Sequence, residues 1–108
     1  MILDAANLLR LNDKMLFLES PSGNRAAYDW LQQQFPDVEI EICNFYSGVH
    51  IDSTITALRE GLVLLNGSRV NSANCPKIFE KWDKIYIDEV IAQDFYNYPY
   101  ASKWIALN

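Results

Sequence analysis

The single histidine of the chain, His50, stands in a context that could support proton transfer. A glycine at position 48 predicts a turn just before it, and Asp52 follows two residues later, on the same side of an extended chain. A carboxylate beside an imidazole holds the ring in one orientation, as general acid/base catalysis requires. A lone histidine more often serves packing than catalysis, so this carboxylate is the feature that favours a chemical role.

The two cysteines, Cys43 and Cys75, are isolated and lack the spacing of a zinc site. Cys43 and His50 could form a nucleophile and base pair, but Cys43 lies beside Ile42 in an alternating apolar segment, which predicts an unreactive core thiol. The sequence also lacks the serine-nucleophile elbow, the phosphate-binding loop and the paired-histidine zinc motif. We therefore expect a reduced, cytoplasmic protein with two buried thiols.

Apolar runs and turn residues predict two units of the same order, each reading strand, strand, helix, strand. The first unit has a short apolar start at residues 3–6, a buried strand at 14–19, a helix with Ala27, Trp30, Leu31 and Phe35 on one face, and a strand at 38–42. The second unit has strands at 53–58, 62–65 and 84–88 and a short helix at 76–82. The pattern predicts an α/β (α+β) fold of two ββαβ modules.

The 108 residues suit one domain, with a first module at about 1–46, a second at about 49–90 and an aromatic tail at 91–108. Leu3-Asp4 with Leu9-Arg10 recurs as Ile51-Asp52 with Leu58-Arg59, which indicates a repeat, although coincidence would also explain so short a match. The tail clusters aromatic residues around a proline, which is typical of an ordered loop. Such a loop would cover core edges or form one wall of a binding cleft.

Composition argues against several classes of partner. The formal net charge is −5, and no run of Lys or Arg could follow a phosphate backbone, so we expect no nucleic acid partner. The longest apolar run, at 61–65, is far shorter than a membrane span, and Asp4 interrupts the apolar start where a signal peptide would continue. We therefore expect a globular protein that does not enter a membrane.

Four short motifs resemble successive motifs of the glycine and inosamine-phosphate amidinotransferases, in that family's order. They are L-D-A-A-N at 3–7, V-H-I-D-S-T at 49–54, G-L-V-L-L-N at 61–66 and A-S-K-W at 101–104. The resemblance covers nearly the whole chain and implies part of the pentein fold, in which five ββαβ units surround a pseudo-fivefold axis. It also implies transfer of an amidino group from arginine to an amine acceptor such as glycine, through a cysteine nucleophile and with no metal or cofactor.

The resemblance assigns a role to five residues. Asp4 resembles the catalytic carboxylate that binds the guanidinium, and His50 resembles the catalytic acid/base. Asp52 resembles a second substrate-binding carboxylate, Arg69 falls where the family binds the substrate carboxylate, and Ser102 matches a substrate-contacting serine. Taken without the resemblance, Asp4 would be a turn or cap residue, Asp52 an orienting partner for His50, and Arg69 a solvated turn residue.

The nucleophilic cysteine is where the sequence departs from the family. That cysteine follows the Ser-Lys-Trp motif in a Gly-rich segment, and neither Cys43 nor Cys75 stands at a matching position. We therefore expect an amidinotransferase-like fragment that is inactive by itself. The alternatives are a non-catalytic module that binds a guanidine or amino acid, and an interaction module that completes or caps a partner amidinotransferase. Exposed sheet edges would favour self-association or docking onto a complementary fragment. The expected small-molecule ligand is arginine-like.

Overall fold

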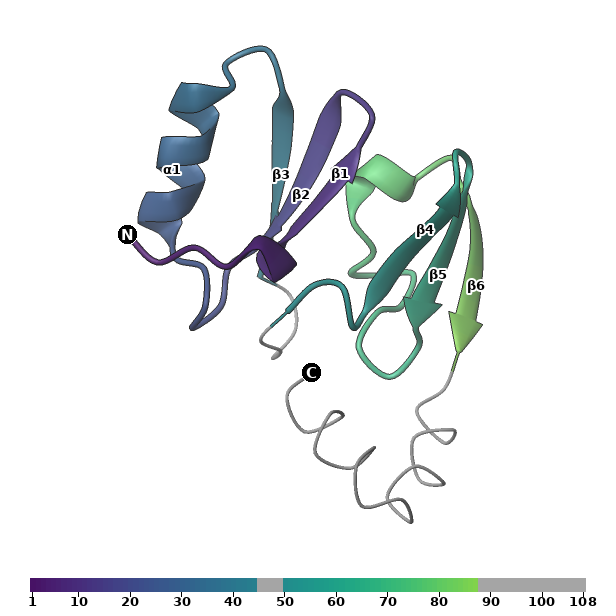
Figure 1. The fold of residues 1–108 in the computed structure, drawn as a ribbon. Helices are drawn as coiled ribbons and strands as arrows, with labels where there is room; N and C mark the ends of the chain where they lie inside the picture. Colours follow the sequence, from purple (N-terminus) through teal and green to yellow (C-terminus); the bar gives the residue numbers. More distant parts are fainter. Residues whose placement is uncertain (45–49, 88–108) are drawn as a thin grey trace.

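Two three-stranded sheets and one α-helix make up the part of the chain that the computed structural model describes, residues 1–44 and 50–87 (Figure 1). This arrangement confirms the predicted α/β class. The first module contains η1 (Ala5–Asn7), β1 (Leu8–Leu11), β2 (Lys14–Leu18), α1 (Arg25–Gln34) and β3 (Glu39–Cys43). The second contains β4 (Ile55–Arg59), β5 (Leu62–Asn66), η2 (Lys77–Phe79) and β6 (Asp83–Ile87).

Both sheets have the same topology. β1 and β2 form an antiparallel hairpin, and β3 returns parallel to β2 after the crossover through α1. β4 and β5 form the second hairpin, and β6 returns parallel to β5. The helix predicted at 76–82 is reduced to the three-residue 3-10 helix η2. The N–H groups of Phe79, Glu80 and Trp82 each donate to the carbonyl three residues earlier, and the Asp83 N–H already donates to the Gly61 carbonyl.

The first strand does not lie where the apolar start predicted it. Asp4 instead ends an extended segment and caps η1, where its carboxylate accepts a hydrogen bond from the Ala6 N–H. The strand follows at Leu8–Leu11, because Asn12, with φ of 61°, makes the tight turn that returns the chain as β2.

The face of α1 is narrower than its sequence pattern predicted. Ala27 and Leu31 are buried, whereas Trp30 and Phe35 are more than 40% exposed. The helix begins after Asn24, whose side chain accepts a hydrogen bond from the Ala27 N–H, and Phe35 already lies past its last turn. Half-buried Tyr28 is the aromatic residue of α1 that packs against the buried cluster on this side of the sheet.

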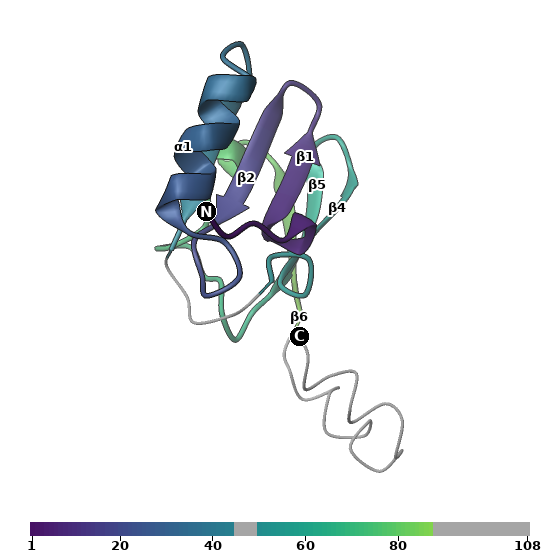
Figure 2. The same ribbon diagram turned by 60° about the vertical axis from the view of Figure 1, so that its left-hand side comes forward.

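The first sheet is covered on both faces, which explains the unbroken apolar run of β2. One face packs on α1 through a cluster of Phe17, Ala27, Leu31 and Ile40 (Figures 1 and 2). The other face packs on the second module, and the two modules thereby share one core. Its buried members are Leu16, Leu18, Cys43, Ile51, Ile55, Val63, Leu65, Val70 and Phe79.

A polar contact joins the modules beside this core. Glu41 of β3 accepts hydrogen bonds from the backbone N–H groups of Lys77 at 2.8 Å and Ile78 at 3.0 Å. These are donors at the start of η2 that the 3-10 helix cannot satisfy itself. The carboxylate of one module therefore fixes the crossover of the other.

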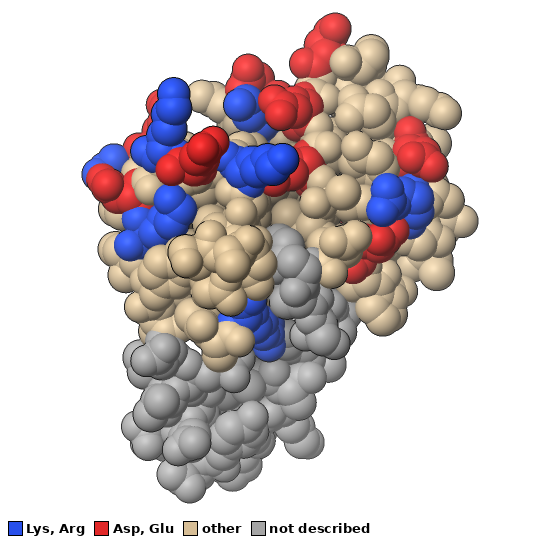
Figure 3. All heavy atoms as spheres, turned by 180° about the vertical axis from the view of Figure 1, so that it is seen from behind, with Lys and Arg blue, Asp and Glu red and all other residues tan. Residues whose placement is uncertain are grey.

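Charged side chains of both signs are mixed on one described face of the protein. On the face seen in Figure 3, basic and acidic residues lie next to one another and form no extended patch of one sign among the described residues. None of the helices in the described ranges is both long and apolar enough to span a membrane.

Candidate functional site

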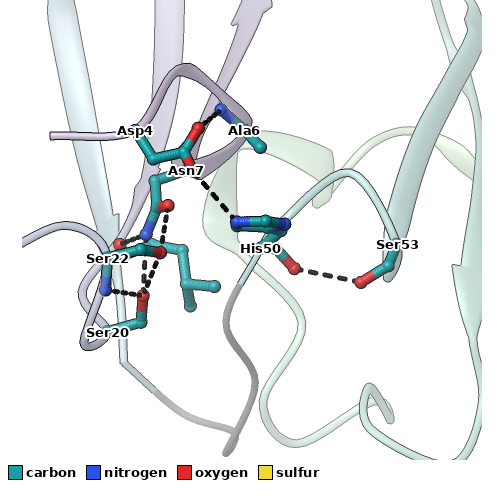
Figure 4. A network of polar contacts seen from close by, with 8 residues as sticks. Asp4, Ala6, Asn7, Ser20, Ser22, His50 and Ser53 are labelled. Carbon is teal, nitrogen blue, oxygen red and sulfur yellow. Dashed lines mark hydrogen bonds and ion pairs between the residues drawn. The ribbon is translucent and has the colours of Figure 1, made fainter. Parts of the chain in front are cut away.

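Asp4 and His50, which are 46 residues apart in the sequence, meet where the two modules join (Figure 4). The imidazole Nε2 of His50 lies 3.1 Å from a carboxylate oxygen of Asp4. The histidine side chain is 22% exposed and the aspartate side chain 47%, so the pair lies at the surface with the carboxylate more open to solvent. This geometry suits a site that a small molecule can reach.

Local hydrogen bonds fix the carboxylate of Asp4. One of its oxygens accepts from the Ala6 N–H at 3.0 Å, which leaves the other oxygen directed at His50. The Asp4 backbone N–H donates to the Ser22 carbonyl at 2.9 Å and so ties this segment to the loop that precedes α1. Asp4 is therefore both a helix cap and a candidate functional residue, and the two interpretations of its role are compatible.

The backbone beside His50 is anchored to the same turn. The Ile51 N–H donates to the Ala6 carbonyl at 2.9 Å, and the Ile51 side chain is fully buried in the shared core. Ser53 donates a hydrogen bond to the His50 carbonyl at 3.1 Å. His50 is thus followed directly by a buried residue and a closed turn, which anchor its backbone.

The carboxylate of Asp4 determines which ring nitrogen of His50 carries the proton. An ionised carboxylate can only accept hydrogen bonds, so the Nε2 atom of His50 must be the donor to Asp4. In the neutral ring this leaves Nδ1 as the nitrogen with a free lone pair. The arrangement can therefore hold one ring proton in place while the opposite nitrogen accepts or releases another.

Asp52 does not lie beside His50 as the sequence pattern predicted. The expected extended chain is absent, because the N–H groups of Thr54 and Ile55 both donate to the Ile51 carbonyl and close a turn. Asp52 is exposed at this turn and makes no hydrogen bond or ion pair with any residue that the structure describes. The carboxylate that orients His50 is instead the distant Asp4.

Arg69 lies next to the turn that follows His50. Its guanidinium donates to the Thr54 hydroxyl at 2.9 Å and to the Ser53 hydroxyl at 3.4 Å. Thr54 is buried and Ser53 itself bonds to the backbone of His50, so the arginine is connected to the site through two side chains. Ser102, the remaining predicted site residue, lies outside the described residues.

The two thiols are poorly suited to nucleophilic attack. Burial raises the pKa of the Cys43 thiol to about 12, with a further contribution from the Glu41 carboxylate. Cys75, which was expected to be buried, is only half-buried, and this burial also raises the pKa of its thiol. The thiolate is the reactive form, so both side chains stay largely protonated at neutral pH. In the described ranges, no three His, Cys, Asp or Glu side chains gather where they could hold a metal ion.

Comparison with known proteins gives this geometry a context. No family model matches the sequence. The chain is 41% identical over 99% of its length to inosamine-phosphate amidinotransferase 1 of Streptomyces griseus, and 33% identical over 97% of its length to L-arginine:L-lysine amidinotransferase of Pseudomonas savastanoi pv. phaseolicola. The chain is related to the amidinotransferases and corresponds to part of their length. It spans about a third of the length of these relatives, 32% and 29% respectively.

Solved structures agree with this assignment. The S. griseus inosamine-phosphate amidinotransferase superposes on 79% of the chain with a TM-score of 0.76 and 41% identity, and the match covers 25% of that structure. DDAH from Pseudomonas aeruginosa superposes on 79% of the chain with a TM-score of 0.65, at 14% identity and over 32% of its own length, which shows a likeness of fold alone. The two modules are therefore part of a pentein-like fold.

One residue of the site was not singled out by the sequence, although it ends the first motif. Asn7 is completely buried, and it lies three residues after Asp4. An uncharged amide among leucines and alanines carries little signal in a sequence. Only its surroundings in the fold show what it holds.

Proposed function

We propose that the chain supplies the guanidinium-binding carboxylate and the acid/base imidazole of an amidino transfer from arginine. The contact of 3.1 Å between Asp4 and His50 is the observation that carries this proposal. Arginine as the amidino donor is supported by the likeness to L-arginine:L-lysine amidinotransferase, and the proposal extends to no particular amine acceptor. The free thiols fit a cytoplasmic setting.

Each member of the pair suits one part of this chemistry. Amidino transfer requires attack at the guanidinium carbon, with positive charge held in place and a proton delivered to the leaving amine. The half-exposed carboxylate of Asp4 can pair with the guanidinium, since a planar guanidinium and a carboxylate match in geometry and charge. His50, with Nε2 held by Asp4, has its second nitrogen for proton transfer to the leaving amine and from the entering one.

Three further residues would bind the rest of the substrate. Arg69, whose guanidinium bonds to the hydroxyls of Ser53 and Thr54, would bind the substrate carboxylate close to the His50 turn. Asp52, exposed on that turn, would bind a substrate amine, and Ser102 keeps its predicted role as a substrate contact. The roles of these residues rest on the family resemblance together with the positions of Arg69 and Asp52.

Binding of arginine tests the first half of the proposal. Isothermal titration of the purified chain with arginine should show binding that Asp4→Asn weakens by at least about tenfold, because a charge-assisted pair is lost. Asp37→Asn is a matched control, since Asp37 is an exposed carboxylate of the α1–β3 loop. Citrulline, which has no guanidinium charge, should bind to the wild-type chain no more tightly than to Asp4→Asn. If Asp4→Asn and Asp37→Asn bind arginine with equal affinity, a guanidinium site at Asp4 is refuted.

The chain is not expected to complete the transfer alone, because burial keeps both described thiols largely protonated, with Cys43 in the core and Cys75 half-buried beside it. We expect no release of ornithine when the purified chain is incubated with arginine and an amine acceptor. A second sample should contain Cys43→Ser and Cys75→Ser together. Ornithine release that persists in this double variant would show that another nucleophile works within the chain.

A role in association with another chain is the second candidate. β6 pairs only with β5 among the described strands, and Ile85, Tyr86 and Ile87 on it are 38% to 43% exposed. An exposed strand edge with apolar side chains favours pairing with a further strand, from a second copy or from a complementary amidinotransferase fragment. Light scattering should show concentration-dependent association that Ile85→Lys abolishes. A monomer at every concentration, together with no capture of an amidinotransferase, would remove this candidate.

A further inference from the structure

Asn7 is a polar residue whose side chain is fully shielded from water yet fully bonded. Its amide nitrogen donates to the Leu18 carbonyl at 2.8 Å and to the Ser20 hydroxyl at 2.8 Å. Its amide oxygen accepts from the Ser22 hydroxyl at 2.8 Å (Figure 4). Buried polar groups are stable only when they are paired, and this one joins the end of β2 to the loop before α1.

The loop has closed tightly around this amide. A Cβ atom at Gly23 would stand 2.8 Å from the Asn7 amide nitrogen, so only glycine fits where the loop passes over it. Ser20 and Gly23 exchange backbone hydrogen bonds with each other, and the Asp4 N–H donates to the carbonyl of Ser22 within that same loop. Asn7 is therefore the buried centre against which the segment that carries Asp4 is held.

We propose that Asn7 is a positioning residue for the pair of Asp4 and His50. The Asn7 N–H donates to the Asp4 carbonyl at 3.0 Å and closes the turn between them, while its side chain fixes that turn to the first sheet. The carbonyl of Ala6, between the two, accepts the N–H of Ile51 and brings in His50. One buried amide thus sets the place of a carboxylate on one module and of an imidazole on the other. The catalytic meaning of this placement rests on the proposed function, but the placement itself does not.

The residue type follows from the partners. Leu18 offers a carbonyl, which needs a donor, while the Ser22 hydroxyl is placed to donate and needs an acceptor. An amide provides both on one planar group, whereas a carboxylate would set an acceptor against the Leu18 carbonyl and a leucine would provide neither. A purely structural role would explain the burial of Asn7, and the two roles differ in what happens at His50 when the amide is removed.

The single histidine makes this difference measurable. In proton–carbon NMR spectra of the labelled chain, the ring of His50 gives one set of resonances, and its nuclear Overhauser contacts to the Asp4 protons report the pairing directly. Asn7→Ala should lose these contacts and move the ring resonances towards their positions in Asp4→Asn. Leu31→Ala is the matched control, because it opens the separate cluster beneath α1 and lowers stability without touching the turn. It should keep the contacts.

The outcomes separate the two roles. Wild-type contacts in folded Asn7→Ala, or an equal loss in Leu31→Ala, would overturn the positioning role. If Asn7→Ala does not fold, Ser22→Ala removes one of the three side-chain bonds, and it should weaken the contacts between Asp4 and His50 while the remaining sheet resonances stay in place. Contacts unchanged in Ser22→Ala would then count against the proposal. Because no substrate is needed, a failure of arginine to bind would refute the proposed function and leave this result standing.

Discussion

Replacing Gly23 with alanine tests how tightly the buried amide is held. The new Cβ would stand 2.8 Å from Nδ2, 3.0 Å from Cγ and 3.3 Å from Cβ of Asn7. The first distance is shorter than van der Waals contact allows, and the side chain of Asn7 cannot turn aside without breaking its bonds to Leu18 and Ser20. The clash must therefore move either the amide or the loop.

The size of the effect follows from three contributions. Overpacking a well-filled site costs about 1–3 kcal/mol. Displacing the amide weakens two of its hydrogen bonds, each with a net value of about 1 kcal/mol. Alanine restricts the unfolded chain and returns about 0.4–1 kcal/mol. We expect Gly23→Ala to lower the free energy of unfolding by about 3 kcal/mol, a large share of the stability of a small domain.

Urea unfolding followed by tryptophan fluorescence measures this loss, and the Asn7→Ala background identifies its cause. That background removes Nδ2 and Cγ, so only the Asn7 Cβ at 3.3 Å remains near the new methyl group. Gly23→Ala should then cost less than about 1 kcal/mol, a coupling that a double-mutant cycle detects. Gly61→Ala serves as a control: its nearest heavy atom is 3.5 Å away, so its cost comes from the φ of +84° and should be equal in both backgrounds. An equal cost of Gly23→Ala with and without the amide would refute the reasoning.

Three further substitutions test other contacts. Glu41→Gln keeps one acceptor at the start of η2 and loses the charge, so the free energy of unfolding should fall by about 1 kcal/mol. Glu41→Ala removes both acceptors and should lower it further. Equal stability of the wild type and both variants would contradict an intermodule cap. Asn24→Ala should cost about 1 kcal/mol through the lost N-cap of α1, whereas Asn24→Ser should recover most of it in the same urea assay. For Cys43, the pKa of the folded thiol, about 12, lies above its ordinary value of 9.0, so the proton is bound more tightly in the folded state. This tighter proton binding stabilises the folded state fully below pH 9. The stabilisation is lost as the pH rises towards 12, and at pH 10 the free energy of unfolding has fallen by about 1.4 kcal/mol. Cys43→Ala should flatten the pH profile over that range, and parallel profiles would show that this thiol does not cause the loss.

Local structure was largely legible in the sequence. The apolar run of β2 and the alternation of β3 predicted two buried strands within a residue or two of where they lie, since both patterns state directly which faces avoid water. The motif around Asp4 and the motif around His50 named both members of the pair, through their resemblance to amidinotransferase motifs. These predictions depended only on residues close together in the chain.

Errors arose where a residue's environment came from a distant segment. Helical spacing assigned Trp30 to the core, but Ala27 and Leu31 are the residues of α1 that are buried against the first sheet, and Trp30 is exposed. Asp52 was assigned to His50 by proximity in the chain, and a turn of backbone hydrogen bonds directed it to solvent instead. Periodicity gives the direction of a side chain relative to its own element and carries no information on which element it will meet.

The sequence by itself determined the residue types of the site, the class of the fold and the likeness to amidinotransferases. Only the tertiary structure decided that Asp4, and not Asp52, holds the imidazole of His50. The physical reason is the core that the two modules share: burying Ile51 in it brings the Ile51 N–H to the Ala6 carbonyl, and that contact sets His50 beside a carboxylate 46 residues away.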